Sequence, residues 1–241
     1  MYAVTDTATA YVFNYPKGTL SQTLTFSPSG GTGSASCSDS SGDVFIGAST
    51  SSPTNGTIYE FSHGGTSPVA TLTNGPYAAF GCSVDPSSED LAVVNNPVDA
   101  CTSGGNVSVY PGGQEPPKIY TVSAGFECYS SASFDGNGDL FVAGRSPSDV
   151  CVLAELPKGS SNFVAVNLSR SITDTLLCRI QWDGTDLAIV APGSTKRSSA
   201  VLYRFHLSGS TGTLIGTTRF AKLHGVAAGS AFIISGRLVT L

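Results

Sequence analysis

The sequence predicts an all-β fold, a β-propeller of four-stranded antiparallel blades, on three observations. Charged residues make up only 12% of the 241 residues, while Gly accounts for 28 and Pro for 13, as in chains of many short strands and turns. A tight acidic turn followed by an apolar strand recurs about every 47 residues. A second motif, an alternating strand followed by a Pro- or Gly-containing turn, recurs with the same period, and such self-similarity is the signature of a repeat architecture.

The acidic turn leads into the second strand of each unit. Its second acid stands at Asp43, Asp90, Asp139 and Asp186. The spacings are therefore 47, 49 and 47 residues. Asp, Asn and Gly are the residues that tight turns require, so we expect these turns to be structural. The alternative is a calcium loop at 135–139, but Ser146 stands where the bidentate Glu of such a loop belongs.

The second motif fixes the blade boundaries. Tyr15-Pro16-Lys17-Gly18 returns as Leu156-Pro157-Lys158-Gly159, 141 residues or three periods later. Four strands, named A to D, in roughly 40–50 residues make one propeller blade. We expect a single propeller domain over 1–241, with six blades in the whole protein. Complete blades are predicted at about 33–73, 78–122, 128–168 and 176–218, and partial ones at 2–26 and 223–241.

The ends and the charge give further expectations. Strand-like residues stand directly at both ends, which predicts a segment of a longer protein, without its signal segment. The net charge is −5 and no Lys/Arg cluster extends beyond Lys196-Arg197, so no nucleic-acid partner is expected. No apolar run approaches the ~18 residues of a membrane span. No cofactor is expected.

Six cysteines stand at positions 37, 82, 101, 128, 151 and 178, with no CxxC pair. An even number in a Lys-poor, Ser/Thr-rich chain favours at least one disulfide and an extracellular, periplasmic or cell-envelope location. The alternative is that several are small buried apolar residues. The first choice of pair is Cys101 with Cys151, because both lie in or just after the B–C loops of consecutive blades.

The D–A and B–C loops share one end of a propeller, and this end is the predicted ligand face. Its candidate residues are Asn74, Tyr77, Asn95, Glu127, Tyr129, Arg145 and Asp174. A metal site there would use the oxygens of Glu127, Asn74 and Asn95. The alternative is a set of polar loop residues that face water. No catalytic residue is predicted: His63 and His206 fall near equivalent C–D turns, and no neighbouring acid would orient them.

The chain resembles the NHL-repeat-like six-bladed propellers, a group of uncharacterised secreted or lipoprotein-like bacterial proteins. The resemblance lies in turns and strand edges, at 14–18, 81–86, 136–142, 155–160 and 180–184. It extends to a wider superfamily that includes gluconolactonases and streptogramin lyases. A shared fold does not by itself carry a function across.

Three functions follow as hypotheses. The first is a non-enzymatic binding or scaffold propeller of the bacterial envelope or exterior, holding a protein or a small carbohydrate-like ligand at the D–A/B–C face. The alternative that the resemblance implies is a metal-dependent hydrolase or lyase of the gluconolactonase or streptogramin-lyase kind. The third is a structural repeat module of a larger surface protein.

Overall fold

The computed structural model describes residues 2–4, 9–14, 17, 19–26, 32–51, 54–97, 104–122, 125–173, 178–192, 200–220, 233–234 and 237–238. The chain divides into two compact units, Met1–Ile119 (unit 1) and Tyr120–Leu241 (unit 2). Within the described ranges nearly all regular structure is β-strand, apart from a short 3₁₀ turn at Pro111–Gly113. No helix there is long and apolar enough to cross a membrane.

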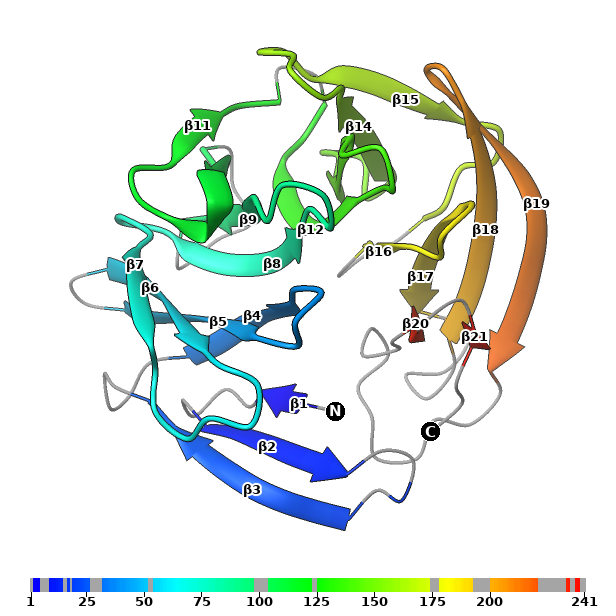
Figure 1. Cartoon of the computed structure of the whole chain (residues 1–241). Helices are drawn as coiled ribbons and strands as arrows, with labels where there is room; N and C mark the ends of the chain where they lie inside the picture. Colours follow the sequence, from blue (N-terminus) through cyan, green and yellow to red (C-terminus); the bar gives the residue numbers. More distant parts are fainter. Residues whose placement is uncertain are drawn as a thin grey trace. The chain divides into compact units, whose positions relative to one another are not determined.

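Unit 1 contains three antiparallel sheets in which sequential strands are neighbours (Figure 1). The first sheet comprises β1 (Tyr2–Val4), β2 (Thr9–Asn14) and β3 (Thr19–Thr25). The second comprises β4 (Thr32–Ser38), β5 (Val44–Ser51), β6 (Thr54–Phe61) and β7 (Ala70–Thr73). The third comprises β8 (Ala78–Val84), β9 (Leu91–Asn96), β10 (Asn106–Tyr110) and β11 (Lys118–Tyr120), whose last residue is the first of unit 2.

Unit 2 repeats the pattern. One group comprises β12 (Cys128–Phe134), β13 (Leu140–Arg145), β14 (Cys151–Leu156) and β15 (Val164–Leu168). The next comprises β16 (Arg179–Trp182), β17 (Leu187–Pro192), β18 (Ala200–Ser208) and β19 (Thr211–Phe220), and β20 (Ile233–Ile234) pairs with β21 (Arg237–Leu238). The predicted all-β class with four-stranded antiparallel sheets is confirmed.

The outer strands of the two groups in unit 2 are joined, which the repeat did not predict. β15 pairs with β19 in parallel, through Asn167 with Thr211 and Leu168 with Gly212. Beside this pairing, the hydroxyl of Ser169 accepts the backbone N–H of Leu214 at 2.8 Å. The two four-stranded groups therefore form one eight-stranded sheet.

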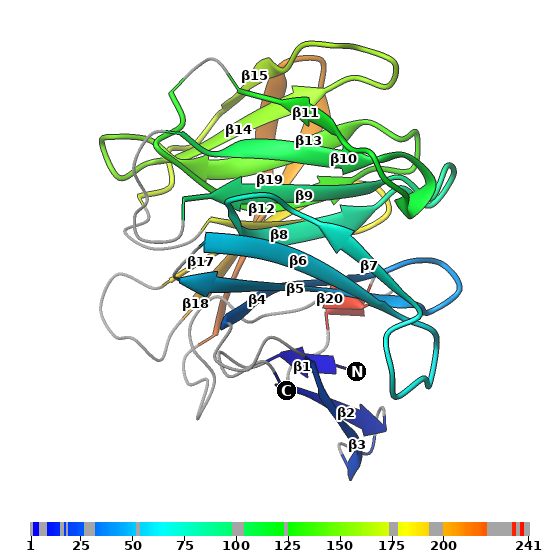
Figure 2. The same ribbon diagram turned by 90° about the vertical axis from the view of Figure 1, so that its left-hand side faces the viewer.

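The cores lie between the sheets, because alternate residues of a strand point to opposite faces. On β5, Ile46 packs into an apolar cluster with Ala10 and Leu24 of the first sheet. The next residue toward the N-terminus, Phe45, packs instead with Leu91 of the third sheet. The second sheet is thus covered on both faces (Figure 2), and its central strand carries apolar residues on both sides, as buried strands do.

Within each unit, the first strands (A) of successive four-stranded groups are linked directly. In unit 1, a disulfide joins Cys37 of β4 to Cys82 of β8, with Cα atoms 5.6 Å apart. In unit 2, the hydroxyl of Ser133 on β12 accepts the backbone N–H of Trp182 on β16 at 2.8 Å. A covalent bond in one unit and a hydrogen bond in the other thus each hold two A strands together.

Candidate functional site

The first acid of each acidic turn stabilises its own turn. In unit 2, Oδ1 of Asp135 accepts the N–H groups of Asn137 at 2.8 Å and Asp139 at 2.9 Å. Oδ1 of Asp39 does the same in unit 1, for Ser41 and Asp43. The turn at 135–139 is thus structural: Asp135 accepts hydrogen bonds from its own turn, as Asp side chains commonly do.

The second acid links the A–B turn to the C–D turn of the same sheet. Its Oδ1 atom accepts a backbone N–H at 2.7 Å in three repeats: Asp43 from His63, Asp90 from Gly112 and Asp139 from Lys158. This shared bond explains why the acid recurs with the period of the repeat. Three acids of these turns, Asp85, Asp135 and Asp186, are at most 5% exposed.

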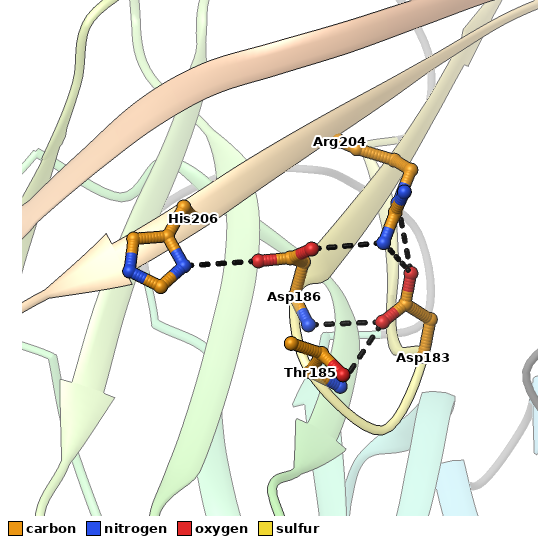
Figure 3. A network of polar contacts seen from close by, with 5 residues as sticks. All are labelled: Asp183, Thr185, Asp186, Arg204 and His206. Atoms are coloured by element: carbon orange, nitrogen blue, oxygen red, sulfur yellow. Dashed lines mark hydrogen bonds and ion pairs between the residues drawn. The ribbon is translucent and has the colours of Figure 1, made fainter.

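The fourth repeat builds a side-chain network at this position (Figure 3). Asp186 accepts a hydrogen bond from Arg204 at 2.8 Å, and its other oxygen lies 3.1 Å from Nδ1 of His206. Arg204 also contacts Asp183 at 2.8 Å. The expectation that no acid would orient His206 is therefore wrong, because Asp186, twenty residues away in sequence, lies beside its ring.

The charge state of Asp183 reflects this network. Burial by itself raises the pKa of the carboxyl, but hydrogen bonds from the N–H groups of Asp186 and Thr185 and the charge of Arg204 outweigh it, so the pKa is lowered overall. Two carboxylates and one guanidinium fix the turn against β18. Within the described residues no group of three His, Cys, Asp or Glu side chains could hold a metal ion.

The predicted ligand face of unit 1 is a buried amide network. Nδ2 of Asn74 donates to Oδ1 of Asn95 at 2.8 Å. Asn95 donates in turn to Oδ1 of Asn106 at 2.8 Å and to the hydroxyl of Ser108 at 2.9 Å. The structure brings Asn74 and Asn95 together, but they do not face water: Asn74 is 4% exposed and Asn95, which lies inside β9, is fully buried.

Tyr110 and Tyr77 complete this end of unit 1. The hydroxyl of Tyr110 donates to the carbonyl of Thr73 at 2.8 Å, and burial raises its pKa well above the usual range. Tyr77 is partly exposed, and its carbonyl lies only 2.1 Å from where a Cβ on Gly56 would stand. The D–A loop therefore packs closely on β6 and requires a glycine there. Sequence reasoning missed Asn106 and Tyr110, which belong to strand β10.

In unit 2, Arg145 forms two ion pairs at the predicted face. Its guanidinium contacts Glu127 at 3.0 Å and Asp149 at 3.3 Å. The ring of Phe126 lies 5.2 Å from that of Tyr129 and covers Gly144, where a Cβ would meet it at 2.6 Å. The structure thus brings Arg145 and Glu127 together at the junction of the D–A loop and β13, a pairing that the sequence did not predict.

Tyr129 was predicted as a loop residue, and the structure corrects this. It lies in β12 and is 4% exposed, and its hydroxyl accepts the N–H of Val122 at 3.0 Å. Asp174 lies outside the described residues.

The disulfide of unit 2 differs from the predicted one. Cys151, the first residue of β14, is bonded to Cys178, not to Cys101. The reason is local: the D–A loop returns across the start of β14, where the N–H of Cys151 donates to the carbonyl of Ile172 at 2.9 Å and Val150 pairs with Thr173. Cys128 is also disulfide-bonded, and Cys101 lies outside the described residues. The disulfides indicate an oxidising, extracytoplasmic setting.

Comparison with known proteins gives the fold. No protein-family model and no curated protein matches the sequence. Among solved structures, the chain is similar to the Malassezia sympodialis allergen Mala s 1, with a TM-score of 0.64 and 12% identity over 91% of this chain and 75% of that one. It is also similar to Kuenenia stuttgartiensis hydrazine synthase, with a TM-score of 0.61 and 11% identity over 86% of this chain and 59% of that one.

A third similar structure is the Dos1 propeller, with a TM-score of 0.59 and 8% identity over 94% of this chain and 57% of that one. The chain thus spans less than two thirds of the hydrazine synthase and Dos1 chains. At these identities the likeness carries the fold alone. The protein has a β-propeller fold, and the NHL-repeat family and the count of six blades stay predictions.

Proposed function

We propose that this chain is a non-enzymatic binding propeller of the bacterial envelope or exterior, which holds a protein or carbohydrate-like partner at its D–A/B–C end. The observation that carries the proposal is the ion pair of Arg145 with Glu127, which bridges the D–A loop and the end of β13. Arginine and aromatic side chains dominate the binding energy of interfaces. Here a partly exposed arginine stands near the partly exposed ring of Phe126, which packs on the buried Tyr129.

Rigidity of these loops supports the proposal. The Cys151–Cys178 disulfide and the bridge between Val150 and Thr173 tie the D–A loop to the B–C loop of the same repeat. Asp149 at the tip of the B–C loop contacts Arg145 a second time. Loops already fixed in one conformation lose less entropy on binding, which favours affinity.

The alternative of a metal-dependent hydrolase or lyase finds less support in the same residues. Oδ1 of Asn95 accepts a hydrogen bond from Asn74, and Glu127 pairs with Arg145. Oxygen ligands for a divalent cation must converge on it at about 2.0–2.6 Å. These side chains would have to exchange their protein partners for the cation.

The test uses a glycan array and a random-peptide phage library, both probed with the disulfide-bonded chain. Ligands selected in this way are expected to bind Arg145→Ala at least about tenfold more weakly, since an arginine that acts as a hot spot contributes about 2 kcal/mol or more. Arg145→Lys keeps the charge but not the planar fork, and we expect it to lose most of the same affinity.

Lys118→Ala is the matched control, because it also removes one cation, from an exposed position on β11. Its affinities should equal those of the wild type. Selected ligands that bind Arg145→Ala as tightly as the wild type would contradict the proposal. Hydrolysis of sugar lactones in added Ca²⁺ or Mn²⁺, lost in Glu127→Gln, would establish the enzymatic alternative instead.

A further inference from the structure

A cavity of about 540 Å³ lies in unit 1, at the end of the sheets that carries the A–B and C–D turns. This is the opposite end of the strands from the loops discussed above. Both four-stranded sheets of the unit contribute to it. Its lining residues are Asp39, Phe45, Glu60, Ala70, Thr71, Leu72, Val84, Glu89, Gly112, Gly113, Gln114 and Glu115.

The cavity combines apolar and acidic lining. Phe45, Leu72 and Val84 are buried side chains of the core between the two sheets. The remaining large side chains are mostly acidic, and among the described residues the lining contains four carboxyl groups and no Lys, Arg or His. Such a lining matches a ligand with an apolar stem and a positively charged head, the form of a lysine or arginine side chain.

Glu60 experiences this negative environment directly. Burial raises the pKa of its carboxyl, and the negative charges of Asp43 and Asp39 raise it further. An entering cation would relieve both repulsions. The cavity is therefore electrostatically complementary to a cation before any cation binds.

Glu89, which lines the same cavity, has an unusual backbone conformation. The A–B turn places the residue before its second acid in the left-handed region, and this residue is Gly42 in one repeat and Gly138 in another, with φ of 86° and 88°. In the repeat that lines the cavity it is Glu89, with φ of 61°. A glutamate there is less favourable than glycine by roughly 1 kcal/mol. The turn itself does not need a carboxylate at this position, and Glu89 lines the cavity.

We infer that this cavity receives a lysine or arginine side chain from a segment of a partner protein. The aliphatic stem lies against Leu72 and Phe45, and the cationic head lies among the carboxylates of Glu60 and Glu89. Charge complementarity selects this occupant over an apolar or acidic segment. A second partner-binding site thus stands at the turn end, separate from the loop end.

The experiment measures binding of a ten-residue alanine-rich peptide with three lysines, by NMR titration of the disulfide-bonded chain. The same peptide with norleucine for lysine keeps the apolar stems and removes the charge. We expect the lysine peptide to shift resonances of the cavity residues and the norleucine peptide to leave them unchanged. Binding of the lysine peptide should weaken as the salt concentration is raised from about 50 to about 500 mM.

Two variants locate the site. Glu60→Gln and Glu89→Gly should each weaken lysine-peptide binding about fivefold, the effect of one partly exposed charge pair. Glu89→Gly should at the same time leave the melting temperature unchanged or raise it, since glycine suits the turn. A purely structural role for Glu89 would not combine weaker binding with undiminished stability.

Glu155→Gln is the matched control. Glu155 has the same environment in its own repeat, where burial and the charges of Asp139 and Asp135 raise its pKa, but it does not line the cavity. It should bind the peptide as the wild type does. An equal loss in Glu155→Gln, equal binding of the norleucine peptide, or shifts that map outside the cavity would each overturn the inference.

Discussion

The hydroxyl of Ser133 accepts the backbone N–H of Trp182 at 2.8 Å and so joins two neighbouring A strands. Ser131 reinforces the contact, since its hydroxyl accepts the N–H of Ile180 at 3.2 Å. Ser133 stands two residues before the first acid of its turn, as Cys37 does in unit 1. The same repeat position therefore carries a hydrogen bond in one unit and a disulfide in the other.

Replacing Ser133 by Ala should lower the free energy of unfolding by about 1–2 kcal/mol, because the N–H of Trp182 loses its acceptor in a part-buried place. Urea denaturation of the wild type and the variant measures the change. Ser67→Ala, at an exposed position, should stay within about 0.5 kcal/mol of the wild type. A neutral Ser133→Ala would show that the hydrogen bond contributes nothing to the contact.

Replacing both Cys37 and Cys82 by Ser should be more costly. The two residues are 45 positions apart, and closing a loop of that length in the unfolded chain stabilises a protein by about 2–4 kcal/mol. The melting temperature of the variant should therefore fall well below that of the wild type under oxidising conditions. In excess reductant the two proteins should converge, and a difference that persists there would point to packing and not to the cross-link.

The sequence predicted the sheets well, because their signals are local. The spacing of the acidic turns placed the start of β5 after Asp43 and the start of β13 after Asp139, where the structure has them. The residues of the turn decide this placement, because Asp and Gly there form a tight turn independently of contacts with distant segments.

The candidate site was less predictable, because its contacts join distant segments. Alternation along a strand gives the face on which Cys151 lies but not its depth, and the partner depends on how the D–A loop returns past Ile172. Asn95 was expected in a loop, although it lies inside β9 and its polar side chain hydrogen-bonds with Asn106 across the hairpin. A buried amide network leaves no periodic signal in a single sequence.

Replacing Gly144 by Ala should disrupt the loop end of unit 2. A Cβ at this position would meet the carbonyl oxygen of Cys128 at 2.1 Å and the ring of Phe126 at 2.6 Å. The backbone oxygen cannot move aside as a flexible side chain can, so we expect a loss of about 1–3 kcal/mol. Gly136→Ala is the control, since a Cβ there would meet nothing within 4 Å. Equal stability of the two variants would contradict the close packing of Phe126 on β13.

Asp183 should make the stability of unit 2 depend on pH in the acidic range. Its pKa is lowered in the folded protein by the N–H groups of Asp186 and Thr185 and by Arg204, which together outweigh burial. Because the pKa is lowered, ionised Asp183 stabilises the fold at pH values above its unfolded pKa of about 3.9. This stabilisation is lost as the pH falls through the folded pKa. The stability difference between the wild type and Asp183→Asn should therefore be largest near pH 6 and shrink toward pH 2.

The pKa of Glu155, in the same unit, is shifted in the opposite direction. Burial and the charges of Asp139 and Asp135 raise the pKa of its carboxyl, so the folded state binds a proton more readily than the unfolded state does. Its ionisation opposes folding above the unfolded pKa of about 4.3, and this penalty disappears on acidification. Glu155→Gln should accordingly be more stable than the wild type near pH 6 and converge with it near pH 3. Parallel pH profiles for Asp183→Asn and Glu155→Gln would contradict both assignments, because the two carboxyls shift in opposite directions.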